Sequence, residues 1–137
     1  MLFDDWTKVA ALPKFADAVV IAVLDALHAP VVSAFSKLGY HILVEKPMAT
    51  SIADCVNMVR EVEAAPHKPI FGIGHVLRYS PYNAMVKEVL DSGAIGDIVN
   101  IQHMEPVGNE HFAHSFVRGN WKNEEETSFA LMTKCCQ

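Results

Sequence analysis

Asp17-Ala-Val-Val-Ile-Ala-Val23 is the stretch of the 137-residue sequence that decides the fold. A β-branched run without polar alternation is typical of a strand that is covered on both faces. A second run, Tyr40-His-Ile-Leu-Val44, follows after about sixteen residues. That spacing leaves room for a crossover helix and is too long for a hairpin. The two runs therefore predict a βαβ unit with parallel strands.

Helices are predicted on either side of these strands. Residues 6–12 form a short one, and Pro30 suits the first position of another over residues 30–38, with Gly39 as its left-handed C-cap. Ser51 and Asp54 predict a capping box at the start of a third helix, which continues to residue 63. The apolar residues that recur at helical spacing in this third helix are Ile52, Val56, Val59 and Val62.

A change of pattern follows the third predicted strand, residues 70–73. Residues 1–75 alternate helix and strand, as in a doubly wound α/β sheet. After Pro81 come a helix that ends near Gly93, a strand with imperfect alternation over residues 98–103, and a polar stretch with little periodicity. The change predicts a domain boundary near residue 78, which separates residues 1–78 from residues 79–137.

Composition excludes several classes of protein. With 51% hydrophobic and 20% charged residues, the chain is neither disordered nor collagen-like. A net charge of −5 argues against nucleic-acid binding. The longest apolar runs, such as Ala18–Leu24, are too short to cross a bilayer, so no membrane association is expected. Three cysteines, two of them adjacent, predict a reducing compartment and a cytoplasmic location.

Polar residues follow each predicted strand. Asp25 and His28 come after the first, Glu45-Lys46-Pro47 after the second, and Arg78-Tyr79 after the third. In open α/β sheets, ligands bind at the carboxyl ends of the strands, so these residues are expected to face one crevice. By position alone, ordinary solvated turns explain them equally well.

The first two of these segments carry a resemblance. Asp17–Val23 followed by Asp25-Ala-Leu-His28, and then Gly39-Tyr-His-Ile-Leu-Val-Glu45-Lys46-Pro47, closely resembles the Gfo/Idh/MocA family of NAD(P)-dependent oxidoreductases, whose signature is Glu-Lys-Pro. The similarity continues through Trp121 and covers nearly the whole chain. It implies an α/β fold: the C-terminal half of a Rossmann-type parallel sheet, followed by the start of an α/β substrate domain. Such domains often make oligomer contacts, so a homo-oligomer is allowed for a full-length relative.

The resemblance also shows two departures from the family pattern. The family's glycine-rich turn, G-x-G-x-x-G/A, is missing: Gly72-Ile-Gly74 has Leu77 at the third position. The family's catalytic Asp and His align with Thr133 and Gln137, which cannot do the usual proton chemistry. We therefore expect a chain that is truncated at both ends and that is inactive by itself.

The intact family implies hydride transfer between NAD or NADP and a sugar, cyclitol or related polyol. By resemblance, Lys46 is the catalytic residue, and Asp25, His28, Glu45 and Pro47 join it around the cofactor, with a cis bond before Pro47. Two alternatives stay open: Lys46 as a solvated surface lysine and His28 as a hydrogen-bonded loop histidine. For the whole chain, a non-catalytic binding or regulatory module, or a nonfunctional remnant, is the alternative.

Four further residues are weaker candidates for substrate contact. Arg78 and Tyr79 resemble a pair at the family's domain junction, although a plain inter-domain ion pair is the favoured interpretation. His111 and His114 are three residues apart and can share a helical face. Zinc sites need three or four protein ligands, and no third ligand has a suitable spacing. The sequence therefore predicts no metal site, and a substrate-side or packing role for these histidines.

Overall fold

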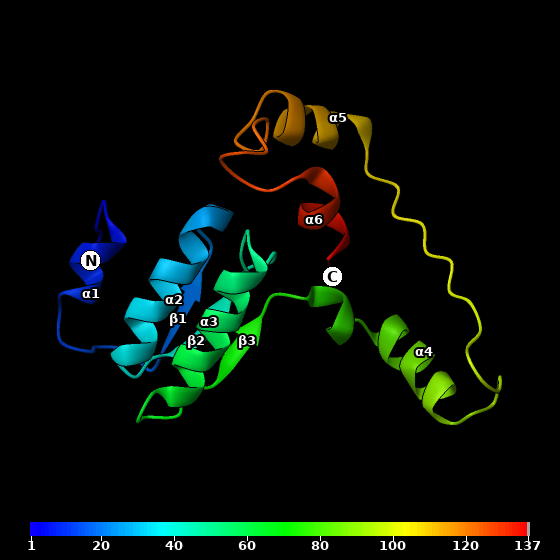
Figure 1. The fold of residues 1–137 in the computed structure, drawn as a ribbon, viewed down its shortest axis with the longest axis horizontal. Coiled ribbons are helices and arrows are strands. Elements are labelled where there is room, and N and C mark those ends of the chain that lie inside the picture. The colour runs from blue at the N-terminus through cyan, green and yellow to red at the C-terminus, as the bar shows by residue number, and fades with distance from the viewer. Residues whose placement is uncertain (137) are drawn as a thin grey trace.

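The computed structural model describes residues 1–136 and contains two regions of different character (Figure 1). We call residues 1–75 the sheet region and residues 76–136 the outer region. The sheet region consists of α1 (Trp6–Ala10), β1 (Ala18–Ile21), the 3₁₀ turn η1 (Asp25–Leu27), α2 (His28–Lys37), β2 (His41–Val44), α3 (Ile52–Ala64) and β3 (Phe71–Ile73). The outer region consists of η2 (Val76–Tyr79), α4 (Pro81–Asp91), α5 (Asn109–Phe112), the π-helical turn η3 (Ala113–Val117) and α6 (Ala130–Cys135).

The three strands form one parallel sheet in the order β1-β2-β3. Ile21 lies opposite Val44 across the first pair of strands, and Val44 lies opposite Ile73 across the second. The register confirms the predicted parallel βαβ unit, with α2 and α3 as the crossover connections. All three strands end at the same edge of the sheet, which sets the position of the loops that follow them.

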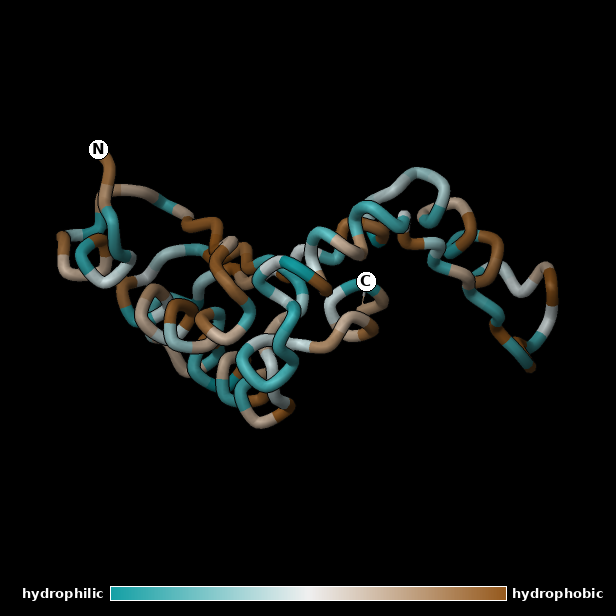
Figure 2. The backbone as a smooth tube through the Cα atoms, turned by 90° about the horizontal axis from the view of Figure 1, so that it is seen from above, coloured by the Kyte–Doolittle hydropathy of each residue, from teal (hydrophilic) through white to brown (hydrophobic). Residues whose placement is uncertain are grey.

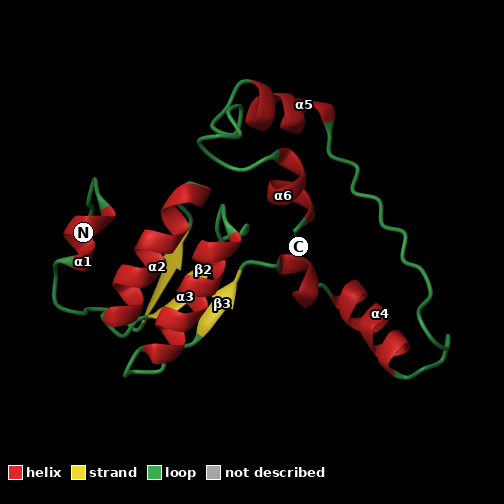
Figure 3. Cartoon of the chain, viewed as in Figure 1, coloured by secondary structure: helices red, strands yellow, loops and turns green. Residues whose placement is uncertain are grey.

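Both crossover helices cover the same face of the sheet (Figure 3). Val32, Phe35 and Met58 on these helices are buried against Ile42 and Val44 of β2. The prediction that the strands are covered on both faces is wrong for residues 1–136, because Val20 is 66% exposed and Leu43 is 46% exposed. Apolar side chains on both faces of a strand show that either face can be buried. They do not show which face the helices cover, and α2 and α3 pack on the same one.

Local sequence signals explain the ends of the helices. Gly39 follows α2 with φ +79°, and a Cβ atom at this position would lie 3.0 Å from the His67 ring. Ser51 caps α3, where its hydroxyl accepts a hydrogen bond from the Asp54 amide at 3.1 Å. The predicted apolar face of α3 is partly wrong: Ile52 is 84% exposed, whereas Met58 is buried. The helix is rotated so that residues 55, 58 and 62 face the core.

The outer region has little apolar core of its own. Helix α4 forms where it is predicted, yet its apolar side chains Met85, Val86 and Val89 stay exposed. Figure 2 shows hydrophobic segments along the outer region, far from the N-terminus. The predicted strand over residues 98–103 is wrong, because the segment has no strand partner within residues 1–136. A strand without a partner leaves its backbone groups unpaired and is not stable in water.

The end of the outer region returns to the sheet region (Figures 1 and 3). Helix α6 follows α5 and η3 and lies near the carboxyl ends of the strands. Within the described part of the chain, no helix is long and apolar enough to span a bilayer.

Candidate functional site

A cavity of about 270 Å³ lies between the carboxyl ends of β1 and β2 and the returning outer region. Asp25, His28, Glu45 and Lys46 line it from the sheet region. His111, Trp121, Thr133 and Lys134 complete the wall from the outer region. The structure therefore brings together four of the five residues that the sequence predicts around the cofactor. It also brings His111, one of the predicted substrate-contact residues, to the same cavity.

His28 is held between the ends of two strands. It is the first residue of α2 and is 1% exposed. Its Nδ1 lies 2.8 Å from the carbonyl oxygen of Pro47, and its Nε2 lies 3.1 Å from that of Val23. A neutral imidazole has one N–H group, so the tautomer decides which carbonyl accepts the hydrogen bond. His28 therefore lies between the Glu45-Lys46-Pro47 loop and the end of β1 and donates a hydrogen bond to one of the two.

The loop after β2 presents a carboxylate beside an ammonium group. The Lys46–Pro47 peptide bond is cis, as the resemblance implies. The Lys46 Nζ donates a hydrogen bond to the carbonyl oxygen of Thr133 at 2.6 Å. A Cβ atom on Gly74 would lie 2.9 Å from Glu45 Oε2, so a larger residue at the end of β3 would displace the Glu45 carboxylate. Gly74 therefore leaves room for the Glu45 side chain.

Asp25 is the centre of a buried polar cluster. Its carboxylate is 3% exposed and accepts hydrogen bonds from Trp121 Nε1, at 3.0 Å, and from the Ser128 hydroxyl. The Ser128 and Thr133 hydroxyls lie 2.9 Å apart. Sequence reasoning missed Ser128, because 103 residues separate it from Asp25 and no local pattern links the two. Trp121 had a weak signal, since it ends the stretch that carries the resemblance.

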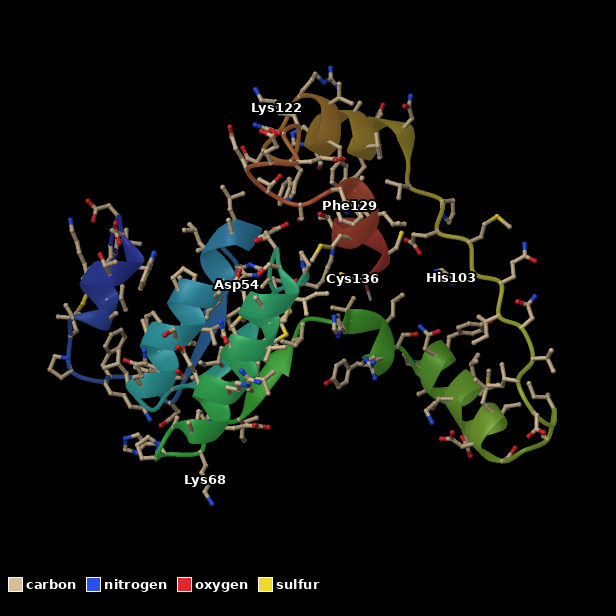
Figure 4. The ribbon with its side chains drawn as sticks, viewed as in Figure 1. Asp54, Lys68, His103, Lys122, Phe129 and Cys136 are labelled. Carbon is tan, nitrogen blue, oxygen red and sulfur yellow. The ribbon has the colours of Figure 1, made fainter. Side chains whose placement is uncertain are left out.

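Lys134 is a second cation in the cavity, and the sequence did not single it out. Burial lowers its pKa most, the positive charge of Lys46 lowers it further, and Glu105 opposes both effects. Burial raises the pKa of the neighbouring Cys136 thiol, and Lys46 opposes that shift. Phe129 and Cys136, labelled in Figure 4, mark the two ends of α6, which carries Thr133 and Lys134 to the cavity.

The remaining predicted site residues lie outside this cavity. Arg78 lines a second cavity, Tyr79 is 82% exposed, and His114 lines neither. Within residues 1–136, no three His, Cys, Asp or Glu side chains are arranged to hold a metal ion. Thr133, aligned with the family's catalytic Asp, is buried in the Asp25 cluster. Gln137, aligned with the catalytic His, is outside the described residues.

Residues 2–75 match the model of a protein family described as an oxidoreductase family with an NAD-binding Rossmann fold. Inositol 2-dehydrogenase 1 of Saccharopolyspora erythraea is 37% identical over 83 residues, which are 61% of this chain and 24% of that protein. The 2,7-anhydro-N-acetylneuraminate hydratase of Escherichia coli is 30% identical over 115 residues, 84% of this chain and 29% of that protein. The chain thus spans about a quarter of the length of these relatives.

A solved structure agrees with these sequence matches. Levoglucosan dehydrogenase in complex with NADH and levoglucosan superposes with a TM-score of 0.63 at 29% identity. The superposition covers 70% of this chain and 25% of that protein. A Rossmann-like α/β fold is therefore shown both by the sequence matches and by the structure.

Proposed function

Because the chain belongs to the oxidoreductase family with an NAD-binding Rossmann fold, we propose that its cavity is the nicotinamide and substrate end of a hydride-transfer site. The cofactor is NAD or NADP, and the substrate is a sugar, cyclitol or related polyol. One observation carries the proposal: Glu45 and Lys46 share a cavity with His28 at the carboxyl ends of neighbouring parallel strands. That edge is where ligands bind in open α/β sheets.

The residues around the cavity fit one end of the cofactor better than the other. Glu45 offers acceptor oxygens and Lys46 offers N–H donors. These groups suit the carboxamide group of a nicotinamide ring beside a substrate hydroxyl. Gly72-Ile-Gly74 continues from β3 into the short turn η2, so within residues 1–136 no glycine-rich turn leads into a long helix that would hold a pyrophosphate. We therefore assign this chain the nicotinamide end alone.

Lys46 acts on the substrate oxygen in this proposal. A bound nicotinamide supplies the carbon that accepts or donates the hydride. The Lys46 ammonium group would donate a hydrogen bond to the substrate oxygen and hold it beside the nicotinamide, where its positive charge favours negative charge on that oxygen. One of its three N–H donors is bound to the carbonyl oxygen of Thr133, which leaves two for the substrate oxygen.

His28 and Asp25 have positioning roles in the same proposal. In the tautomer with its proton on Nδ1, the His28 ring donates a hydrogen bond to the carbonyl oxygen of Pro47 and fixes the loop that carries Lys46. The Asp25 carboxylate holds Trp121 and Ser128, which fixes the opposite wall of the cavity. Thr133 has no carboxylate and cannot accept the substrate proton as an aspartate would. We therefore expect the 137-residue chain to bind ligands without turnover.

Saturation-transfer NMR with NADH tests this proposal. We expect transfer to the nicotinamide protons, and we expect the Lys46→Ala variant to weaken it several-fold because one wall of the cavity loses its cation. Lys122→Ala, an exposed lysine outside the cavity, is the matched control and should leave the signal unchanged.

Two results would contradict the proposal. Transfer confined to the adenine protons, or absent from NADH altogether, would remove the nicotinamide site. Turnover of a polyol with NAD(P) by this chain, abolished in Lys46→Ala, would show that the expected inactivity is wrong. Binding of a sugar without any cofactor binding would instead favour the non-catalytic module.

A further inference from the structure

A second cavity, of about 610 Å³, lies in the outer region beside the first. Its walls come from η2, α4, the stretch around His103 and the end of α6. His103 and Cys136, both labelled in Figure 4, lie near this part of the molecule. The polar residues that line the cavity are Arg78, Asn83, Lys87, His103, Glu105 and Lys134.

The lining carries an excess of positive charge. Arg78, Lys87 and Lys134 are cationic side chains, whereas Glu105 is the one carboxylate in the lining. Lys87 pairs with Asp91 on its own helix. The carboxylate of Glu105 lies 3.5 Å from His103 Nε2. Within residues 1–136, no carboxylate lies within 4.0 Å of the Arg78 or Lys134 nitrogens, so these two charges are not neutralised by an ion pair.

Lys134 connects this cavity to the first one, because its side chain lines both. Burial and the nearby Lys46 lower the pKa of Lys134, so its positive charge is unfavourable where it lies. A negative group of a ligand would offset that cost. Arg78 adds a planar guanidinium group, which can donate two parallel hydrogen bonds to a carboxylate or a phosphate.

We propose that the second cavity binds the anionic group of the substrate, so that the polyol is an acidic sugar, with a carboxylate or a phosphate at Arg78 and Lys134 and its reacting hydroxyl at Lys46. The assignment of the reacting hydroxyl rests on the proposed function. The anion site itself rests on the charges of the second cavity. In a chain with a net charge of −5, such a local cluster of cations is the feature that would select a negative ligand.

Isothermal titration of the full chain at low salt tests this proposal with matched sugars. D-Glucuronate and D-glucose 6-phosphate carry the two candidate anionic groups, and D-glucose is the neutral control. We expect at least one acidic sugar to bind about tenfold more tightly than D-glucose, a typical effect of one charge-assisted contact. The acid that binds more tightly identifies the group.

Variants locate the anion. Arg78→Gln should weaken the acidic sugar about tenfold and leave D-glucose unchanged, since it removes a charged donor outside the first cavity. Lys134→Gln should weaken the acidic sugar more than it weakens D-glucose, because Lys134 lines both cavities. Lys122→Gln is the matched control, because Lys122 is exposed and lines neither cavity. Both Arg78 and Lys134 are at least partly exposed, and a far-ultraviolet circular dichroism spectrum checks that each variant folds.

Three outcomes would overturn the proposal. The first is equal affinity for acidic and neutral sugars, including no measurable binding of either. The second is a loss in Arg78→Gln and Lys134→Gln no larger than in Lys122→Gln. The third is inorganic phosphate that binds as tightly as D-glucose 6-phosphate, which would show a site for a free anion. If the NMR experiment shows no saturation transfer to NADH but the chain still binds acidic sugars more tightly than D-glucose, the proposed function is wrong and the anion site stands.

Discussion

The sheet region and the outer region are ordered by different interactions. In the sheet region, Val32, Phe35 and Val44 are buried in one apolar core. In the outer region, apolar residues are exposed to solvent: Val99 is 96% exposed and Met104 is 79% exposed. Hydrogen bonds that Asp25 accepts and that Lys46 donates attach the outer region to the strand ends. The comparison teaches that one wall of this cavity is supported by an apolar core, whereas the other is held in place by a few polar contacts.

The Phe35→Ala variant should produce the largest loss of stability. Phe35 is 3% exposed and its ring packs edge to face on Tyr40 at a centroid distance of 5.3 Å. We expect the free energy of unfolding to fall by about 3–5 kcal/mol, since the substitution leaves a cavity in the core. Urea denaturation measures the change. Phe15→Ala, at a residue that is 60% exposed, is the control, and an equal loss there would contradict the assignment of the core.

The Asp25→Ala variant should loosen the outer region selectively. It leaves the buried Ser128 hydroxyl and the Trp121 indole without their acceptor. We expect a loss of about 1–3 kcal/mol, the cost of unsatisfied buried donors. Hydrogen exchange should increase around α6 and stay unchanged in β2. Asp25→Asn keeps an acceptor oxygen and should lose less, whereas equal exchange in both regions would show that they unfold together.

The Val89→Ala variant should have the smallest effect. Val89 is 44% exposed on α4, so the substitution removes few contacts. We expect a change below about 0.5 kcal/mol. Val32→Ala, at a residue with no exposed surface, is the matched control and should cost considerably more in the same urea titration. A large effect at Val89 would mean that α4 is packed against something in solution.

Sequence patterns predicted the sheet region well because its signals are local. The spacing of the apolar runs gave the strands, and Gly39 and Ser51 marked helix ends that the structure confirms. The uncovered face at Val20 and the rotation of α3 depend on which helices pack against the sheet, and residue spacing does not contain that information. The predicted strand over residues 98–103 is wrong for the same reason, since alternating apolar and polar residues do not supply a neighbouring strand to pair with.

The site divides in the same way. Asp25, His28, Glu45 and Lys46 could be placed together because parallel strands end at one edge. Ser128 and Lys134 reach that edge by the return of the chain, and no periodicity indicates it.

The hydrogen bond between Lys46 and the carbonyl oxygen of Thr133 uses one of the three N–H donors of that ammonium group and leaves two for a ligand oxygen. The contact holds a flexible side chain in place before any ligand arrives, so a ligand that binds there does not bear the full cost of ordering it. Ordering a lysine side chain costs up to about 1.5–2 kcal/mol, which corresponds to roughly a tenfold or larger change in affinity. Substitutions that move α6 away from Lys46 should therefore weaken binding at this position as well as the fold.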